Sequence, residues 1–372
     1  MEHEGTGTTA SCEAENSLES LQHGAQQDLD PSLCQTIDGE LGDMETLSAV
    51  RDLIAKGANP NAFYGVYHEH ALGCAIRRSK QQTAMELVAA GANISLLARK
   101  RTQSPPALEQ ALSAGMLDLA RMIAPLTDLE QRNWMGELPW MRGLSAISNA
   151  EELAPFLPSR PPCQEDLDQA LLIAMEGSPL LAERAVAMLI PMGASPSSSN
   201  SEGFSALMQA INHDGEGAAL ALIDAGANLA ARDVPGDTAF SWAAIRGSEP
   251  LLRCLAPFSN VDQRHVDGRT PLMQAIEYHS VNENTEDALV FLLSMSNLEA
   301  RVDKKTTMPA GVEEAGEMIS LWEFAKAMAP CSRVLELVRG ALDAKAAREE
   351  ALDIAASTPS SPAPIRGKVK FL

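Results

Sequence analysis

The string Gly-Ala-Asn recurs along this sequence and decides its fold class. It occurs in KGANPNA (Lys56–Ala62), AGANISL (Ala90–Leu96) and AGANLAA (Ala225–Ala231), and MGASPSS (Met192–Ser198) is a serine variant. Gly57 and Gly91 are 34 residues apart, Gly193 and Gly226 are 33 apart, and Gly91 to Gly193 is three periods of 34. The period continues through IAPLTDLEQR (123–132) and PFLPSRPP (155–162), where the glycine is replaced. A fixed period of this length predicts a repeat architecture.

A second mark stands before each expected first helix. It is a turn glycine followed by an apolar run, in EGFSALMQAI (202–211), PGDTAFSWAA (235–244) and DGRTPLMQAI (267–276). Thr270 is placed to cap a helix, and Pro271 fits its first turn because the missing N–H costs nothing there. A second helix over 218–225 would end at Gly226 in the left-handed conformation. Neither helix can bury its apolar stripe alone, so the units are expected to stack into one core.

These marks resemble those of the ankyrin-repeat family, whose unit carries T-P-L-H-x-A-A at its first helix and Gly-Ala-Asp/Asn after its second. The matching stretches are TPLMQAI (270–276), SALMQAI (205–211) and the Gly-Ala-Asn strings. The sequence departs from the family at Met208 and Met273, which replace the histidine, and most marks are lost over 104–193. The resemblance implies an all-α repeat solenoid of eight or nine stacked helix-turn-helix units with short loops or hairpins.

Charge and composition divide the chain into four parts. Residues 1–50 contain 11 acids and no Lys or Arg. Residues 357–372 are rich in proline and contain three basic residues in their last seven positions, and no acid. Both ends have too few apolar residues to offset the entropy of ordering them. We therefore expect an acidic disordered tail over 1–36, the array over 37–343, a capping helix over 344–356 and a disordered basic tail over 357–372.

The composition argues against several classes of partner. The formal net charge is -21, from 50 acids and 29 bases, which argues against binding to nucleic acid or anionic lipid. No apolar run is long enough for a membrane span, and the first residues do not resemble a secretory signal. The six cysteines are widely spaced without a C-x-x-C pair, which favours reduced thiols in the cytoplasm. We expect a cytoplasmic monomer without a cofactor or metal.

The sequence contains no strong catalytic pattern. GFSAL (203–207) lacks the second glycine of a nucleophile elbow, and its serine occupies the helix-capping position. His68-Glu69-His70 lacks the spacing that places two histidines on one helical face, so we interpret it as an exposed loop. We predict that the chain is not an enzyme. The alternative is an enzymatic or toxin-like activity in the irregular region 104–196 or the terminal unit 301–343, although Cys163 and Cys331 have no histidine partner in their segments.

Large side chains on loops predict contact with a protein, and three clusters qualify. The first is aromatic, the second contains two of the four tryptophans, and the third places basic residues at successive loop tips. Their members are Phe63, Tyr64, Tyr67 and His68; Trp134 and Trp140; and Arg232, Arg264, His265, Arg269, Arg301, Lys304 and Lys305. Two alternatives stay open: the arginines serve a structural or solubilising role, and the tryptophans fill space in the irregular units.

These features predict a non-catalytic scaffold that binds a folded protein through the concave face and loop tips of its array. The acidic excess favours a partner with a basic surface. Two narrower hypotheses are an inhibitor that occludes a basic enzyme, and a bacterial effector delivered into a host cell without a signal peptide. The effector hypothesis draws on the 20 arginines against nine lysines, which suggest a GC-rich genome.

Overall fold

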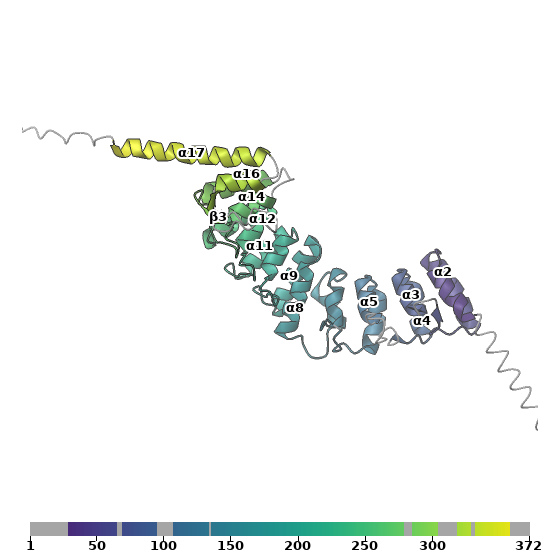
Figure 1. Cartoon of the computed structure of the whole chain (residues 1–372). Helices are drawn as coiled ribbons and strands as arrows, with labels where there is room; N and C mark the ends of the chain where they lie inside the picture. Colours follow the sequence, from purple (N-terminus) through teal and green to yellow (C-terminus); the bar gives the residue numbers. More distant parts are fainter. Residues whose placement is uncertain are drawn as a thin grey trace, which may run out of the picture. The chain divides into compact units, whose positions relative to one another are not determined.

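The computed structural model describes residues 29–64, 69–94, 107–133, 135–278, 285–303, 318–328 and 332–357. Within these ranges the chain is mostly helical with few strands, which confirms the all-α prediction (Figure 1). The chain divides into two compact units, unit 1 (Met1–Ser198) and unit 2 (Ser199–Leu372). None of the described helices combines the length and apolarity that crossing a bilayer requires.

Unit 1 consists mainly of successive helices that pack in pairs, such as α3 with α4, α5 with α6 and α8 with α9. Residues 29–38 form its first described helical segment. The other elements are α2 (Asp43–Ala55), β1 (Phe63–Tyr64), β2 (Glu69–His70), α3 (Ala71–Arg77), α4 (Gln81–Ala89), α5 (Ala107–Ser113), α6 (Leu117–Ile123), η2 (Ala124–Leu126), η3 (Pro139–Ser145), α7 (Ala150–Leu153), η4 (Ala154–Phe156), α8 (Gln164–Met175) and α9 (Pro179–Met192). In the hairpin, Phe63 lies opposite His70 and Tyr64 opposite Glu69.

Unit 2 has two rows of helices. Its elements are α10 (Ala206–Asn212), α11 (Glu216–Asp224), α12 (Ala239–Arg246), α13 (Glu249–Leu255), η5 (Ala256–Phe258), α14 (Pro271–Tyr278), α15 (Glu286–Met295), β3 (Arg301–Asp303), β4 (Met318–Ser320), α16 (Leu321–Met328) and α17 (Ser332–Ser357). Helices α10, α12, α14 and α16 pack in that order, and α11, α13, α15 and α17 form the second row. Strands β3 and β4 are antiparallel, with Val302 opposite Ile319.

Hydroxyl side chains start the first helices of unit 2. Ser205 Oγ accepts a hydrogen bond from the Met208 backbone N at 3.2 Å, and Thr270 Oγ1 accepts one from Met273 N at 3.4 Å. These bonds satisfy N–H groups that have no partner within the helix. The capping prediction for Thr270 is confirmed, α14 begins at Pro271 as expected, and Ser205 caps a helix.

The Gly-Ala-Asn mark forms a turn, and each of its three residues has a separate structural role. Gly226 follows the second helix of its pair with a φ of 87°, the left-handed conformation that glycine adopts without strain. Ala227 is buried, and Asn228 Oδ1 accepts a hydrogen bond from the Ala230 N at 3.1 Å, which closes the next turn. The same side-chain bond recurs at Asn59, where the acceptor holds Asn61 N at 2.9 Å.

Where the glycine is missing, the second helix ends in a 3₁₀ turn with the sequence Ala-Pro-Leu or Ala-Pro-Phe. These turns are η2, η4 and η5. The polar acceptor survives after η2 and η5, since Asp128 Oδ1 accepts from Glu130 N at 3.0 Å and Asn260 Oδ1 from Asp262 N at 3.2 Å. The turn geometry therefore continues at two places that have lost the glycine.

The predicted boundary of the acidic tail at residue 36 was wrong. Residues 29–38 are helical, and Leu33, Cys34 and Ile37 are buried on one face of that helix. Asp38, at its end, bonds Arg77 at 2.9 Å and Arg78 at 2.7 Å. The acidic composition concealed three apolar residues at helical spacing, and burying them offsets the entropy of ordering the segment. Residues 1–28 lie outside the described residues.

The predicted capping helix over 344–356 is the second half of α17, a single helix of 26 residues. Val334 and Val338 near its start are buried, whereas the described side chains from Ala346 to Leu352 are exposed. Figure 1 shows α17 continuing beyond the end of α16. The predicted tail overlaps it at Ser357, and residues 358–372 lie outside the described residues.

Candidate protein-interaction surface

Three loops precede the first helices of unit 2, and we refer to residues 200–204, 232–237 and 264–269 as the tip loops. Each is closed by a backbone hydrogen bond: Asn200 N to Phe204 O at 3.1 Å, Asp233 N to Asp237 O at 3.1 Å, and His265 N to Arg269 O at 2.9 Å. A glycine with a φ between 75° and 94° occupies the same position in each, at Gly203, Gly236 and Gly268.

The tip loops are bonded to one another. Val234 N donates to Glu202 O at 2.9 Å, and Val266 N donates to Pro235 O at 2.9 Å. The contact is close at Gly203, where an added Cβ would lie 2.7 Å from the carbonyl oxygen of Arg232. These bonds fix the three loops as one continuous surface.

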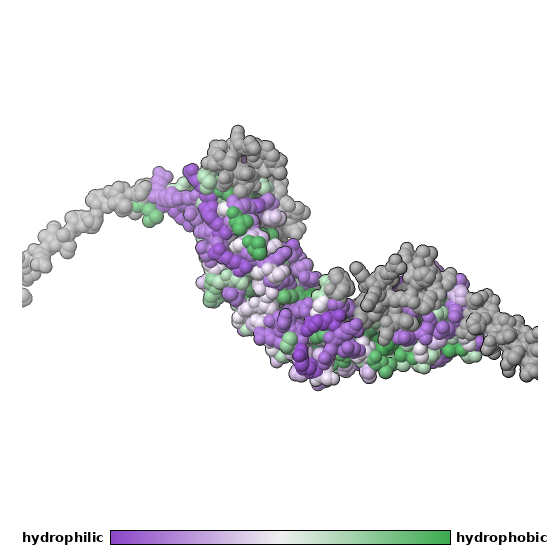
Figure 2. Space-filling model, turned by 60° about the horizontal axis from the view of Figure 1, so that its bottom comes forward, coloured by the Kyte–Doolittle hydropathy of each residue, from purple (hydrophilic) through white to green (hydrophobic). Residues whose placement is uncertain are grey.

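Two valines project from this surface. Val234 is 73% exposed and Val266 is 75% exposed, although their backbones are held by the bonds between loops. Exposing apolar side chains on an ordered loop is unfavourable, so such positions are candidates for partner contact. On the face drawn in Figure 2, hydrophobic residues form separate patches in a mostly hydrophilic surface. The sequence analysis missed both valines, although each follows two polar residues at the start of its tip loop.

Of the arginines predicted at these tips, two are occupied by structural contacts. Arg264 Nη1 donates to Gly268 O at 2.6 Å and to Arg301 O at 2.9 Å, which ties its own loop to β3. Arg269 pairs with Asp267 at 2.6 Å and with Glu277. For these two residues the structural alternative is favoured.

The other basic residues of that cluster differ in their surroundings. Arg232 is exposed and donates to Gln263, and Arg301 is exposed on β3. Arg232 comes two residues before Val234 in the chain, and the Arg301 carbonyl accepts the hydrogen bond from Arg264, so both exposed arginines lie next to tip loops and remain available to a partner. Lys304 and Lys305 lie outside the described residues.

His265 lies between two carboxylates rather than on the open surface. Its Nδ1 is 2.9 Å from Asp267 Oδ1, and its Nε2 is 3.7 Å from Asp237 Oδ2. Burial raises the pKa of Asp237. The hydrogen bond that Gln274 Nε2 donates to Asp237 at 2.9 Å lowers this pKa, but by less than burial raises it. Burial also acts to raise the pKa of Asp267, but hydrogen bonds from Arg269 outweigh it and lower that pKa. The group therefore supports the tip loops from beneath.

Trp242 is a further support that the sequence analysis did not single out. Its indole Nε1 donates to Asp233 Oδ2 at 3.1 Å, and its ring meets Phe204 edge to face with the centroids 5.0 Å apart. Trp242 therefore joins two tip loops through one side chain. The residue comes from α12, so only folding brings it beneath these loops.

The aromatic candidates in unit 1 have a different outcome. Trp140 has no exposed surface, so its prediction as a partner contact was wrong; it fills the core where η3 packs on α5. Phe63 and Tyr64 lie on β1, whereas Tyr67, His68 and Trp134 lie outside the described residues. His70 is buried at the start of α3, so the expectation of an exposed His68–His70 loop is wrong for His70.

The described part of the irregular region 104–196 contains three buried carboxylates with structural contacts, Glu109, Glu137 and Asp166. Asn133 Nδ2 donates to Glu109 at 3.1 Å and to Glu137 at 2.9 Å, and Arg142 holds Glu137 with two hydrogen bonds. Burial raises the pKa of Glu109. These contacts join α5 to the loop before η3.

Cys163, considered above as a nucleophile, precedes α8. Its backbone N and its Sγ both lie within hydrogen-bonding distance of Asp166 Oδ2, at 3.3 and 3.2 Å. Asp166 is also paired with Arg132. These contacts place Cys163 in the cap of a helix. The described residues contain no group of three or more His, Cys, Asp or Glu side chains arranged to hold a metal.

No protein-family model and no curated protein matches the chain.

Proposed function

We propose that the chain is an ankyrin-type repeat solenoid that acts as a non-catalytic scaffold for a protein partner. Its support is the recurrence of one local design: a hydroxyl cap, two packed helices, a left-handed glycine and a polar side chain that closes the next turn. In such an array each repeat packs only against its neighbours, so its loops are not needed to form the core and can contact a partner. The 3₁₀ endings with proline are a departure from the family pattern.

The surface proposed to bind the partner is the row of tip loops in unit 2. The observation that carries this proposal is the exposure of Val234 and Val266 on loops bonded to each other through backbone groups. A surface held in one conformation loses less entropy on binding, which favours affinity. Arg232 and Arg301 supply a polar border to the apolar contact.

The proposed partner is a folded protein with a largely basic surface and an apolar patch, and carboxylates beside that patch would pair with Arg232 and Arg301. The net charge of -21 would attract it at long range, and the valines would make the short-range contact. The inhibitor and effector hypotheses are both compatible with this surface. For the effector, removal of residues 1–28 should abolish delivery and leave partner binding intact, because the buried helical residues start after that point.

The test is affinity capture from a native lysate with three full-length baits: wild type, Val234→Asp/Val266→Asp and Leu180→Asp. Leu180 is an exposed leucine on α9 in unit 1, so its variant is a matched control for adding charge to an apolar surface position. We expect one abundant partner, identified by mass spectrometry, that the tip variant loses and the control retains. Equal retention by the tip variant would exclude the tip loops as the binding surface.

A fourth bait, Tyr64→Ala/Tyr67→Ala, tests the hairpin of unit 1 independently. Loss of the same partner would extend the contact to that hairpin. Retention would remove the aromatic cluster from the binding surface. Circular dichroism and thermal unfolding of each variant would establish that it folds as the wild type does.

A further inference from the structure

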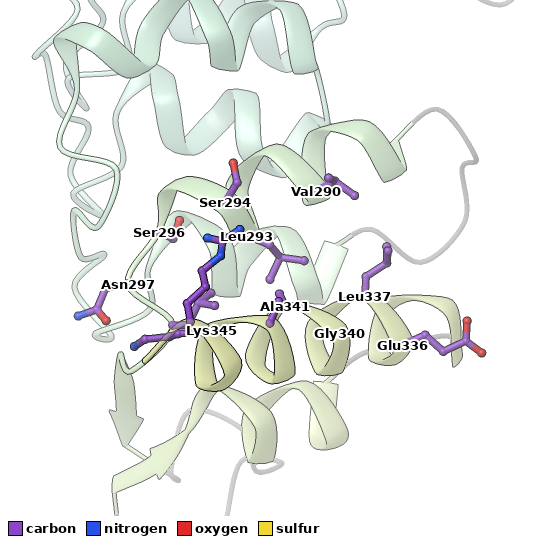
Figure 3. A pocket seen from close by; sticks show the side chains of 13 residues that line it. Val290, Leu293, Ser294, Ser296, Asn297, Glu336, Leu337, Gly340, Ala341 and Lys345 are labelled. Atoms are coloured by element: carbon purple, nitrogen blue, oxygen red, sulfur yellow. The ribbon is translucent and has the colours of Figure 1, made fainter. Parts of the chain in front are cut away.

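Helices α15 and α17 leave a groove of about 500 Å³ between them (Figure 3). Its lining is predominantly apolar, with Leu293 and Val290 on α15 and Leu337 on α17. Glu336, Lys345 and Arg348 are the charged residues of the lining, all on α17. A hydrophobic groove of this kind accepts the apolar face of an amphipathic peptide.

The groove exists because the side chains of α17 that face α15 are small. Gly340, Ala341 and Ala344 line it and carry at most one side-chain carbon each. The space between the preceding two helices of this row, α13 and α15, is filled by larger side chains. There the guanidinium of Arg253 on α13 lies 4.9 Å from the ring centroid of Phe291 on α15. Helices α15 and α17 are therefore in contact, but their side chains leave this space open.

We propose that the groove is the docking site of the chain's own last residues, 358–372. The segment starts where α17 ends, and α17 is itself one wall of the groove. From Gly340 to Ser357 the helix rises about 26 Å, whereas fifteen residues in extended conformation reach about 50 Å. The segment is thus long enough to run back along α17 and cover the groove.

The chemistry of the segment fits this site. Its last eight residues are IRGKVKFL, and in an extended chain Ile365, Val369 and Phe371 point to one side while the basic residues alternate with them. The apolar side would meet Leu293 and Leu337. Arg366, Lys368 and Lys370 would face exposed carboxylates of α17, Glu336 at the groove and Asp343 beside it, and would point away from Lys345 and Arg348.

The prolines of the segment favour the required change of direction. Pro359, Pro362 and Pro364 cannot continue a helix, so the chain is free to leave the axis of α17 soon after Ser357. This inference concerns contacts within one chain and does not rest on the proposed partner surface.

The test uses the full-length chain with a photo-crosslinking phenylalanine analogue at position 371. We expect crosslinks within one molecule to residues 286–298 and 332–348, mapped by mass spectrometry. Ala341→Leu fills the groove and should reduce these crosslinks at least fivefold. Arg339→Leu is the matched control, because it adds an apolar side chain at an exposed position of α17 that does not line the groove, and it should leave the yield unchanged.

Three outcomes would overturn the proposal. The first is an absence of crosslinks to α15 and α17 in the wild type. The second is an unchanged yield in Ala341→Leu when circular dichroism shows that the variant is folded. The third is crosslinks only between molecules, with a yield that falls on dilution, which would assign the groove to a second copy of the chain.

Discussion

Lys80 is a buried cation that holds the first described helical segment of unit 1 in place. Lys80 is the N-cap residue of α4 and is 5% exposed. The ammonium Nζ donates three hydrogen bonds, to Ile37 O at 2.8 Å, Gly39 O at 2.9 Å and Thr46 Oγ1 at 2.9 Å. Two of the acceptors are backbone carbonyls where helix 29–38 ends, so one side chain joins that helix to α2 and α4.

We predict that Lys80→Met destabilises this part of unit 1 by about 3 kcal/mol. Methionine keeps most of the aliphatic volume but leaves two carbonyls without their donor, at about 1–3 kcal/mol for each buried unsatisfied group. The hydroxyl of Thr46 costs less, because it still donates to Gly42 O at 2.9 Å. The variant no longer has to bury a charged ammonium, and this gain offsets part of the cost of the two unsatisfied carbonyls. The net destabilisation is therefore expected in the lower half of the range for two such groups.

The measurement is urea unfolding combined with hydrogen exchange of the amides in residues 29–55. Lys56→Met is the control, because Lys56 is exposed at the end of α2. We expect faster exchange and a lower midpoint for this segment in Lys80→Met only. A change below about 0.5 kcal/mol, which is usual for surface substitutions, would refute the assignment of Lys80 as a structural cation.

The same contact predicts a dependence on pH. Burial lowers the pKa of Lys80 below 10.5, so the folded state holds the proton less tightly than the unfolded state. By linkage, the free energy of unfolding then rises as pH increases from that lowered pKa towards 10.5 and levels off above it. Lys80→Met should lack this rise, and equal pH profiles for the two proteins would contradict it.

Three further predictions concern other sites. Gly203→Ala should destabilise unit 2 by about 1–3 kcal/mol in urea unfolding, because the backbone has a φ of 75° and the new Cβ would meet the Arg232 carbonyl; a neutral effect would contradict the close contact between tip loops. Arg78 and Arg77 lower the pKa of Asp38 to about 2, so their ion pairs should stabilise the first helix above pH 3.8 and lose that effect as pH falls through 2. The gain should stay below about 1 kcal/mol because the pairs are largely exposed, and Asp38→Asn should remove this pH dependence of unfolding. Trp140→Ala should cost about 3–5 kcal/mol of stability as a core truncation, and a stable variant with impaired binding would instead indicate a contact role.

The local design of the helix pairs was predictable from sequence because it depends on residues close together in the chain. The cap at Thr270, the start at Pro271 and the stop at Gly226 each involve bonds within a few residues. The capping helix over 344–356 was predicted as well, although the structure makes it the second half of α17. Helix 29–38 was missed because an acidic composition outweighed three apolar residues that are buried only when a neighbouring helix covers them.

The candidate surface depended on contacts between residues about 30 positions apart. The sequence alone predicted an all-α chain with a period near 34 and basic residues at successive loops, since local turn chemistry and hydrophobic spacing specify these features. Only the tertiary structure decided which of these side chains are available. Packing placed Trp140 in the core, paired Arg264 and Arg269 with carbonyl and carboxylate groups, and left Val234 and Val266 exposed. Burial and hydrogen bonding depend on the neighbouring helices and loops rather than on residue type.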